Sequence, residues 1–213
     1  MSKIELKNVS KTLKKRAILS NITYTFESGK IYGLHGKNGS GKTMLLRAIC
    51  GLISLDSGSV KIDNKELGKD IEFPESIGVI IENMTLLPEY TSYQNLKMLS
   101  KIKRIANDDD IKNTLISVGL DPYDKKKVKE FSLGMRQKLN IAQAIFENPQ
   151  IILLDEPTNA LDEKSVLAVR NLLIDFKSKD KIIIIASHNK EDLDALCDKI
   201  ILIEDGKIRK DVE

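Results

Sequence analysis

The sequence lacks the features of a membrane-spanning or disulfide-rich secreted protein. No stretch approaches the length needed to cross a bilayer, and the most apolar runs, Ile151–Leu154 and Ile182–Ala186, are only as long as strands. The charged N-terminal residues lack the apolar core of a signal peptide. The two cysteines, Cys50 and Cys197, have neither metal-ligand spacing nor the pattern of a disulfide framework, which suits a reducing cytoplasm. Any membrane role is therefore expected to come through a partner protein.

A strong charge of one sign is also missing. The formal net charge of +3 is too small to argue for nucleic acid as a partner. Two short basic runs, Lys14–Arg16 and Lys125–Lys127, are interpreted first as solvated loops, with contact to anionic lipid or a partner protein as the less favoured alternative. Hydrophobic residues make up 41% and charged residues 31% of the chain, so a globular protein is expected rather than a disordered one.

Strand-sized and helical segments alternate along the chain. Strands are expected at residues 4–9, 22–26, 31–35, 59–62, 77–81, 151–154, 182–186 and 200–203, and helices at 43–50, 138–146, 163–176 and 190–196. The strands at 151–154 and 182–186 show almost no polar alternation, which is typical of parallel strands covered on both faces. Between about Thr91 and Phe146, apolar residues recur at helical spacing. The pattern predicts an α/β core with a mainly helical segment inserted in its middle.

A glycine-rich segment, Gly36–Thr43, lies between a predicted strand and a predicted helix and matches the P-loop pattern. Its glycines let several backbone N–H groups face one phosphate chain, and the following helix N-terminus favours an anion. Lys42 can reach the β- and γ-phosphates, and the Thr43 hydroxyl can bind Mg²⁺. A glycine turn that happens to precede a lysine is the alternative, and the strand–loop–helix context disfavours it. The predicted nucleotide-binding residues here are Gly36, Asn38, Gly39, Ser40, Gly41, Lys42, Thr43 and Met44.

Two carboxylates, Asp155 and Glu156, directly follow the apolar run at 151–154. A carboxylate at the end of a buried strand can hold Mg²⁺ through water, and we assign this role to Asp155. Glu156, one residue further on, can accept a proton from the attacking water. On this segment alone, a helix-capping acidic pair before Pro157 stays open as the alternative.

The segment Phe131–Gln137 begins Phe-Ser-Leu-Gly-Met and resembles a degenerate form of the signature sequence of the ABC ATPases, usually Leu-Ser-Gly-Gly-Gln. Ser-x-Gly before a helix is also a plain N-cap, but the position shortly upstream of Asp155 favours the signature. Asn159–Asp162 resembles the D-loop of this family. Ser187–His188 resembles its switch histidine, although a lone histidine after a strand is usually a polar surface residue. The resemblance covers nearly the whole chain.

The resemblance implies an α/β P-loop NTPase fold with a mainly parallel sheet, an N-terminal antiparallel β part and an inserted helical subdomain. It implies a single ABC ATPase domain over residues 1–213, with a core lobe at 1–82 and 147–213 and a helical subdomain at approximately 83–146.

The family also implies that the chain hydrolyses ATP with Mg²⁺ as a head-to-tail dimer. Each ATP would lie between the P-loop of one subunit and the signature segment of the other. Ser132 and Gly134 would contact the γ-phosphate across the interface, and His188 would contact it from its own subunit. The expected catalytic residues are thus Lys42, Glu156 and His188.

Two positions depart from the usual pattern of the family. Leu13 stands where an aromatic residue commonly stacks on adenine, so weaker and less selective base recognition is expected. Glu82 stands where a glutamine is expected, and its oxygen could approach Mg²⁺. We interpret Glu82 as a residue that couples the metal site to a membrane partner, with a strand-end surface residue as the alternative. Glu82 and Ser132–Met135 together are similar to bacterial exporters of bacitracin and lantibiotic-type peptides.

Three classes of function are compatible with a P-loop. In the first, ATP hydrolysis drives transport through a separate membrane-spanning subunit, with export of a peptide, drug or lipid-like substrate. The chain would then act as a homodimer, or as a heterodimer with a second ATPase subunit, at the inner face of the cell membrane. In the second, a non-transport ABC-type ATPase acts on a nucleic-acid or ribosome partner. A single cassette in 213 residues without a long heptad run favours transport. The third, a P-loop kinase or GTPase, leaves the signature segment unexplained.

Overall fold

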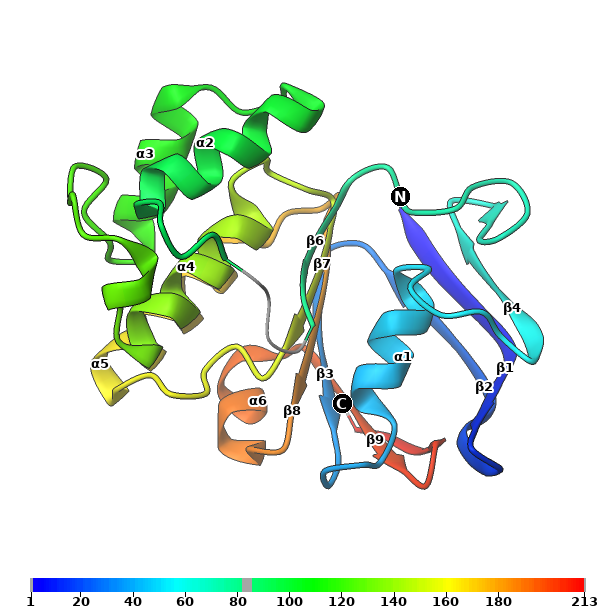
Figure 1. Cartoon of the computed structure of the whole chain (residues 1–213). Helices are drawn as coiled ribbons and strands as arrows, with labels where there is room; N and C mark the ends of the chain where they lie inside the picture. Colours follow the sequence, from blue (N-terminus) through cyan, green and yellow to red (C-terminus); the bar gives the residue numbers. More distant parts are fainter. Residues whose placement is uncertain (1, 82–85, 213) are drawn as a thin grey trace.

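Two β-sheets face each other across one helix in the computed structural model, which describes residues 2–81 and 86–212 (Figure 1). The strands are β1 (Lys3–Leu13), β2 (Arg16–Glu27), β3 (Lys30–His35), β4 (Ser57–Ile62), β5 (Lys65–Glu66), β6 (Ile77–Ile80), β7 (Ile151–Asp155), β8 (Ile182–Ser187), β9 (Lys199–Glu204) and β10 (Lys207–Val212). The helices are α1 (Lys42–Ile49), α2 (Ser92–Lys103), α3 (Asp108–Ser117), α4 (Leu133–Ile145), α5 (Glu163–Phe176) and α6 (Lys190–Leu196), with a 3₁₀ turn at Val128–Glu130.

The larger sheet has the strand order β10-β9-β3-β8-β7-β6. Its strands run parallel except for β10, which pairs antiparallel with β9. Every residue of β8 is buried, because layers of the protein cover both faces of the sheet. The predicted mainly parallel sheet is therefore confirmed. Since β3, β7 and β8 are adjacent and parallel, the segments that follow them meet at one edge.

The smaller sheet is antiparallel, with the order β2-β1-β4-β5, and forms the predicted N-terminal β part. A tight turn joins β1 to β2, where Lys14 and Lys15 both have positive φ angles, 47° and 67°. Leu13 pairs with Arg16 across this turn. The basic run at 14–16 is exposed, as its interpretation as a solvated loop requires.

Two hydrophobic clusters lie on the two faces of the larger sheet. Helix α1 packs between the sheets, where one cluster joins β1, β3, α1 and β8. The other cluster lies on the opposite face and includes residues of α2 through α6. Figure 1 shows α2, α3 and α4 gathered on one side of the sheet, away from the antiparallel strands. Cys50 lies inside the first cluster as a buried small side chain.

Several elements differ from the sequence-based expectation. Strands β1 and β2 extend well beyond the expected 4–9 and 22–26, and the short strand β5 was not predicted. Helix α4 begins at Leu133 rather than at residue 138, because the Ser132 hydroxyl accepts a hydrogen bond from the Met135 backbone at 3.2 Å and caps an earlier first turn. Strand β10 was not predicted, because its charged residues conceal a strand whose pairing with β9 is supplied by the backbone. None of the helices in the described part of the chain combines the length and apolarity that crossing a bilayer requires.

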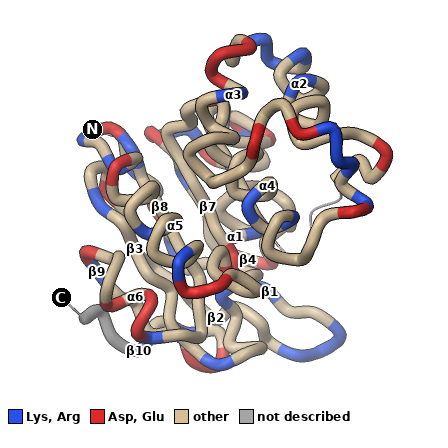
Figure 2. Tube along the Cα trace, turned by 90° about the vertical axis from the view of Figure 1, so that its left-hand side faces the viewer, with Lys and Arg blue, Asp and Glu red and all other residues tan. Residues whose placement is uncertain are grey.

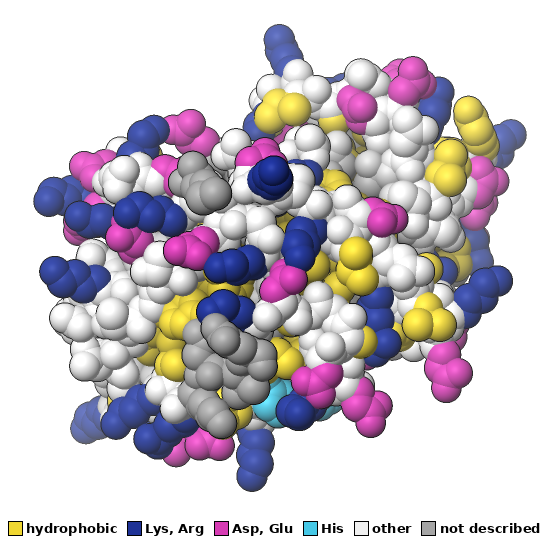
Figure 3. Space-filling view, turned by 180° about the vertical axis from the view of Figure 1, so that it is seen from behind, with side chains coloured by type: hydrophobic (Ala, Val, Ile, Leu, Met, Phe, Trp, Pro, Cys, Tyr) yellow, Lys and Arg dark blue, Asp and Glu magenta, His cyan; other side chains and the backbone are white. Residues whose placement is uncertain are grey.

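Charges of both signs are mixed over the surface. Figure 2 shows Lys and Arg interspersed with Asp and Glu around α2 and α3 and along the sheet edges. In the view from behind, hydrophobic side chains form small groups between charged ones (Figure 3). This mixture agrees with the small net charge of +3.

Candidate functional site

The loop that connects β3 to α1 packs closely against neighbouring backbone. Gly41 caps α1 with a φ of 111°, a backbone conformation that residues other than glycine rarely adopt. An added Cβ there would lie 2.8 Å from the Ile18 carbonyl oxygen. At Gly36, an added Cβ would lie 2.3 Å from the carbonyl oxygen of Ile203 in β9. The course of this loop therefore depends on glycine at both positions.

The start of α1 is suited to an anion. Its first turn contains no acidic residue, and Gly41 provides no side-chain cap for the backbone N–H groups. Lys42 Nζ donates to the carbonyl oxygens of Gly36, at 2.6 Å, and Lys37, at 3.3 Å, so the ammonium lies over the loop. The buried Ser40 hydroxyl has no hydrogen-bond partner among the described residues. These groups fit the oxygens of a phosphate chain.

Burial dominates the electrostatics of Lys42. The residue is 5% exposed, and this burial lowers the pKa of its ammonium, while the carboxylates of Glu156 and Asp155 partly oppose the shift. A buried cation with little solvent around it interacts strongly with an incoming anion. The arrangement therefore favours a negatively charged ligand beside Lys42.

Two oxygen groups converge beside the loop from different elements. The Thr43 hydroxyl in the first turn of α1 donates to Asp155 Oδ2 at the end of β7, at 2.7 Å. Mg²⁺ prefers such oxygen ligands and takes few of them from a protein when phosphate oxygens and water complete its shell. The described residues contain no cluster of three or more His, Cys, Asp or Glu that could hold a metal. The donor set therefore fits Mg²⁺ bound together with a nucleotide.

Glu156 is held by residues that follow the neighbouring strand β8. Its Oε1 accepts a hydrogen bond from the His188 backbone at 3.0 Å and lies 2.8 Å from His188 Nδ1. Its Oε2 accepts from the Ser187 hydroxyl at 3.2 Å. The Glu156 backbone N–H donates to the Ala186 carbonyl at 2.8 Å. The carboxylate is thus fixed at the carboxyl edge of the sheet, where it fits the role of a general base.

Most of the predicted nucleotide-binding residues line one cavity of about 340 Å³. The lining consists of Leu13, Arg16, Ile18, Asn38, Gly39, Ser40, Gly41, Lys42, Thr43, Met44, Asp155 and Glu156. Gly36 and His188 do not line it, but they contact Lys42 and Glu156. The structure therefore brings the P-loop, the paired carboxylates and the histidine together.

The predicted residues of the signature segment are not brought to this cavity. Ser132 and Gly134 lie at the N-terminus of α4 and are absent from its lining, so one chain does not unite the signature segment with its own P-loop. Ser132 does act as an N-cap of α4, as the alternative interpretation of this segment proposed. Glu82 lies outside the described residues, and its role stays a prediction.

Sequence reasoning missed several residues of the site. Arg16 and Ile18 line the cavity beside Leu13. Arg16 could have been found, because it follows Leu13, which had been assigned to the adenine, by only three residues. The amide nitrogen of Gln137 donates to the carbonyl oxygens of Glu156 and Pro157, a contact that no sequence pattern signals.

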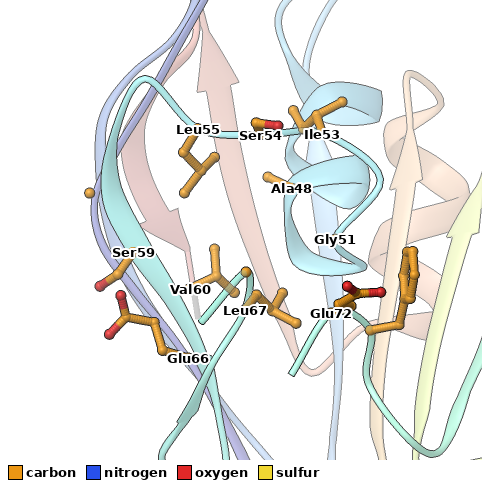
Figure 4. A pocket seen from close by; sticks show the side chains of 13 residues that line it. Ala48, Gly51, Ile53, Ser54, Leu55, Ser59, Val60, Glu66, Leu67 and Glu72 are labelled. Atoms are coloured by element: carbon orange, nitrogen blue, oxygen red, sulfur yellow. The ribbon is translucent and has the colours of Figure 1, made fainter. Parts of the chain in front are cut away.

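A second cavity, of about 490 Å³, lies at the C-terminal end of α1 (Figure 4). Its lining consists of Ala48, Gly51, Ile53, Ser54, Leu55, Gly58, Ser59, Val60, Glu66, Leu67, Gly68, Glu72 and Phe73. Figure 4 shows Val60 and Leu67 between the strand and α1, with the carboxylate of Glu66 at one side. This lining has two carboxylates and no Lys or Arg, so it does not suit a triphosphate despite its size.

The comparisons with known proteins agree with this geometry. The sequence model of a family described as ABC transporter matches residues 19–159. YybJ, an uncharacterized ABC transporter ATP-binding protein of Bacillus subtilis (strain 168), is 56% identical over 205 residues, which are 96% of this chain and 94% of that protein. The lantibiotic transport ATP-binding protein SrtF of Streptococcus pyogenes is 36% identical over 206 residues, 96% of this chain and 88% of SrtF. Proteins similar to the chain also include an ATP-binding protein for methionine import from Clostridium acetobutylicum.

A solved structure has the same architecture. The ATP-binding cassette MJ0796, in a dimeric post-hydrolysis state bound to ADP and phosphate, superposes with a TM-score of 0.88 at 25% identity. The superposition covers 99% of this chain and 98% of that one.

Proposed function

The chain belongs to the ABC transporter family of ATP-binding proteins and is an ATP hydrolase, and from this premise we propose that it drives transport through a separate membrane-spanning subunit. The observation that carries the proposal is the single cavity in which the P-loop, Asp155 and Glu156 converge. ATP binding would hold two such chains together and hydrolysis would release them, and this change in association would act on the membrane-spanning subunit.

In the proposed nucleotide site, the loop backbone and Lys42 hold the triphosphate. Thr43 and Asp155 hold Mg²⁺, and their contact at 2.7 Å places both oxygens at the same point of the site. When bound, Mg²⁺ offsets the negative charge of the phosphates. Leu13 and Ile18 offer apolar surface to the base, and Arg16 lies beside them in the lining of the cavity.

Glu156 is proposed as the general base. It takes a proton from water while the water oxygen bonds to the γ-phosphorus, and the bond from that phosphorus to the bridging oxygen breaks to release ADP and phosphate. His188 holds the carboxylate through its backbone N–H and Nδ1. We also propose that the ring of His188, with a half-exposed side chain, contacts the γ-phosphate once ATP is bound.

A dimer is proposed because one chain leaves its signature segment away from its own P-loop. Ser132 is exposed and the neighbouring Leu133 is 69% exposed, so the N-terminus of α4 is free to meet a second chain. The similar cassette MJ0796 is dimeric in its solved structures. In the proposed head-to-tail arrangement, Ser132 and Gly134 contact the nucleotide of the partner.

The helical part is proposed as the portion that responds to the membrane subunit. We propose that residues 83–146 form a helical subdomain against a core lobe of 1–82 and 147–213. The collection of α2, α3 and α4 on one side of the larger sheet supports this division (Figure 1). The chain would then lie at the inner face of the cell membrane.

Export of a peptide is the proposed direction and cargo. The support is the similarity to SrtF, whose name states lantibiotic transport. Similarity to a methionine import protein shows that the same domain also serves uptake, so the cargo has to be tested with the membrane subunit present. Isolating the chain from native membranes and identifying the membrane protein that co-purifies would supply that partner.

A comparison of wild type with Glu156→Gln tests the proposed chemistry. The variant should bind ATP and hydrolyse it at least about a hundredfold more slowly, since an amide cannot accept the proton. It should also elute as an ATP-dependent dimer in gel filtration with Mg-ATP. Glu66→Gln, on β5 and outside the lining of the nucleotide cavity, is the control and should behave as wild type. A monomeric, fully active Glu156→Gln would refute both the base and the shared site.

A further inference from the structure

Gln137 connects α4 to the main chain of the proposed base. It lies two residues after Met135 in the first turns of α4, and its side-chain Nε2 donates to the carbonyl oxygens of Glu156, at 3.3 Å, and Pro157, at 2.9 Å. These carbonyls belong to the loop after β7, nineteen and twenty residues further along the chain. The contact therefore joins α4, the helix that begins in the signature segment, to the loop after β7 within one subunit.

The loop at Glu156 has a backbone conformation that needs support. Glu156 has a φ of 49° and Ala160 a φ of 66°, both in the left-handed region that side chains disfavour. Such conformations persist where surrounding contacts over-determine them, and they are concentrated at functional sites. The φ of Glu156 decides where its side chain points relative to β7, so a contact on its carbonyl also bears on the position of its carboxylate.

The same loop has a second attachment on the core side. The Thr158 hydroxyl donates to Asp192 Oδ2 in α6 at 2.7 Å, and the other oxygen of Asp192 pairs with Arg170 of α5. Core helices thus hold the loop at Thr158, and α4 holds it at Glu156 and Pro157. Helix α4 also comes close at Gly134, where an added Cβ would lie 3.2 Å from the Ala160 carbonyl oxygen.

We propose that Gln137 is a positioning residue for ATP hydrolysis: it holds the Glu156 main chain so that the carboxylate can accept the proton of water, and it ties that position to the signature segment of the same subunit. The inference rests on the proposed role of Glu156 as the base. It assigns Gln137 no contact with the nucleotide, so its removal should slow turnover and leave ATP binding intact.

Substitutions that keep the size of the side chain test this. Gln137→Met has similar length without a donor, and Gln137→Asn keeps the amide but is one methylene too short to reach both carbonyls. Both variants should lower kcat about tenfold, equivalent to about 1.4 kcal/mol in the barrier, with the dissociation constant for ATP within about twofold of wild type. Gln143→Met, on the same helix and half-buried, is the matched control and should leave kcat unchanged.

A double-mutant cycle separates positioning from general structural support. Single-turnover hydrolysis is measured for wild type, Gln137→Met, Glu156→Gln and the double variant. If Gln137 acts through Glu156, the double variant should be as slow as Glu156→Gln alone. An equal drop from Gln137→Met in both backgrounds would overturn the inference, as would an unchanged kcat in either Gln137 variant.

The same set of proteins distinguishes failure of this inference from failure of the proposed function. A wild-type chain without ATPase activity, or a fully active Glu156→Gln, would reject the proposed chemistry and the inference with it. A slow Glu156→Gln beside a fully active Gln137→Asn would reject only the positioning role. If Gln137→Met does not fold, as judged by circular dichroism, Gln137→Asn replaces it in the cycle.

Discussion

Replacing Lys42 by Met should abolish most of the affinity for ATP while leaving the fold intact. The Lys42 ammonium is buried, lies over the loop at 2.6 Å from the Gly36 carbonyl oxygen, and belongs to the first turn of α1. Two unit charges about 4 Å apart interact by about 4 kcal/mol at an effective dielectric constant of about 20. Because burial already disfavours the ammonium and lowers its pKa, we take about 3 kcal/mol as the loss. This corresponds to about 150-fold weaker binding.

Titration calorimetry of ATP into each variant would measure this loss. Lys37→Met is the matched control, since it removes the same charge from the same loop at an exposed position. Its ATP affinity should stay within about threefold of wild type, because solvent screens an exposed charge. Equal losses in the two variants would indicate a general effect of positive charge, and unchanged affinity in Lys42→Met would show that the phosphates do not lie beside this ammonium.

Three other changes test separate parts of the structure. Leu13→Tyr should tighten ATP binding by roughly 1 kcal/mol through aromatic stacking, as measured by dissociation constants; no gain would mean that Arg16 already covers the base. Thr43→Val should raise the Mg²⁺ concentration for half-maximal ATPase activity about tenfold, because it removes the hydroxyl that meets Asp155; an unchanged Mg²⁺ titration would exclude this ligand. Gly78→Ala would place a Cβ 1.7 Å from the Ala144 carbonyl oxygen, so about 3 kcal/mol of stability and about 6–12 °C in Tm should be lost; thermal unfolding that matches wild type would contradict this close approach of β6 and α4.

Local sequence patterns were sufficient to predict the elements that have a clear capping residue or a contiguous motif. Helix α5 was predicted at 163–176 and is found at Glu163–Phe176, where the Asp162 side chain caps its first turn. Helix α6 was likewise placed at its observed bounds, with Asn189 as its cap. The P-loop was recognisable because its glycines, lysine and threonine are contiguous and lie between a strand and a helix.

The sequence by itself determined the chemistry of the site: a phosphate-binding loop, two adjacent carboxylates, a histidine and the order in which they occur. Only the tertiary structure decided their contacts, such as His188 on Glu156, Thr43 on Asp155 and Gln137 on the Glu156 main chain. These partners are 19 to 112 residues apart along the chain, and a local pattern carries no information about which of many polar groups will meet. The parallel pairing of β7 with β8 and the packing of α4 on β6 bring these side chains into contact. Such tertiary contacts determine where the end of each strand and helix lies.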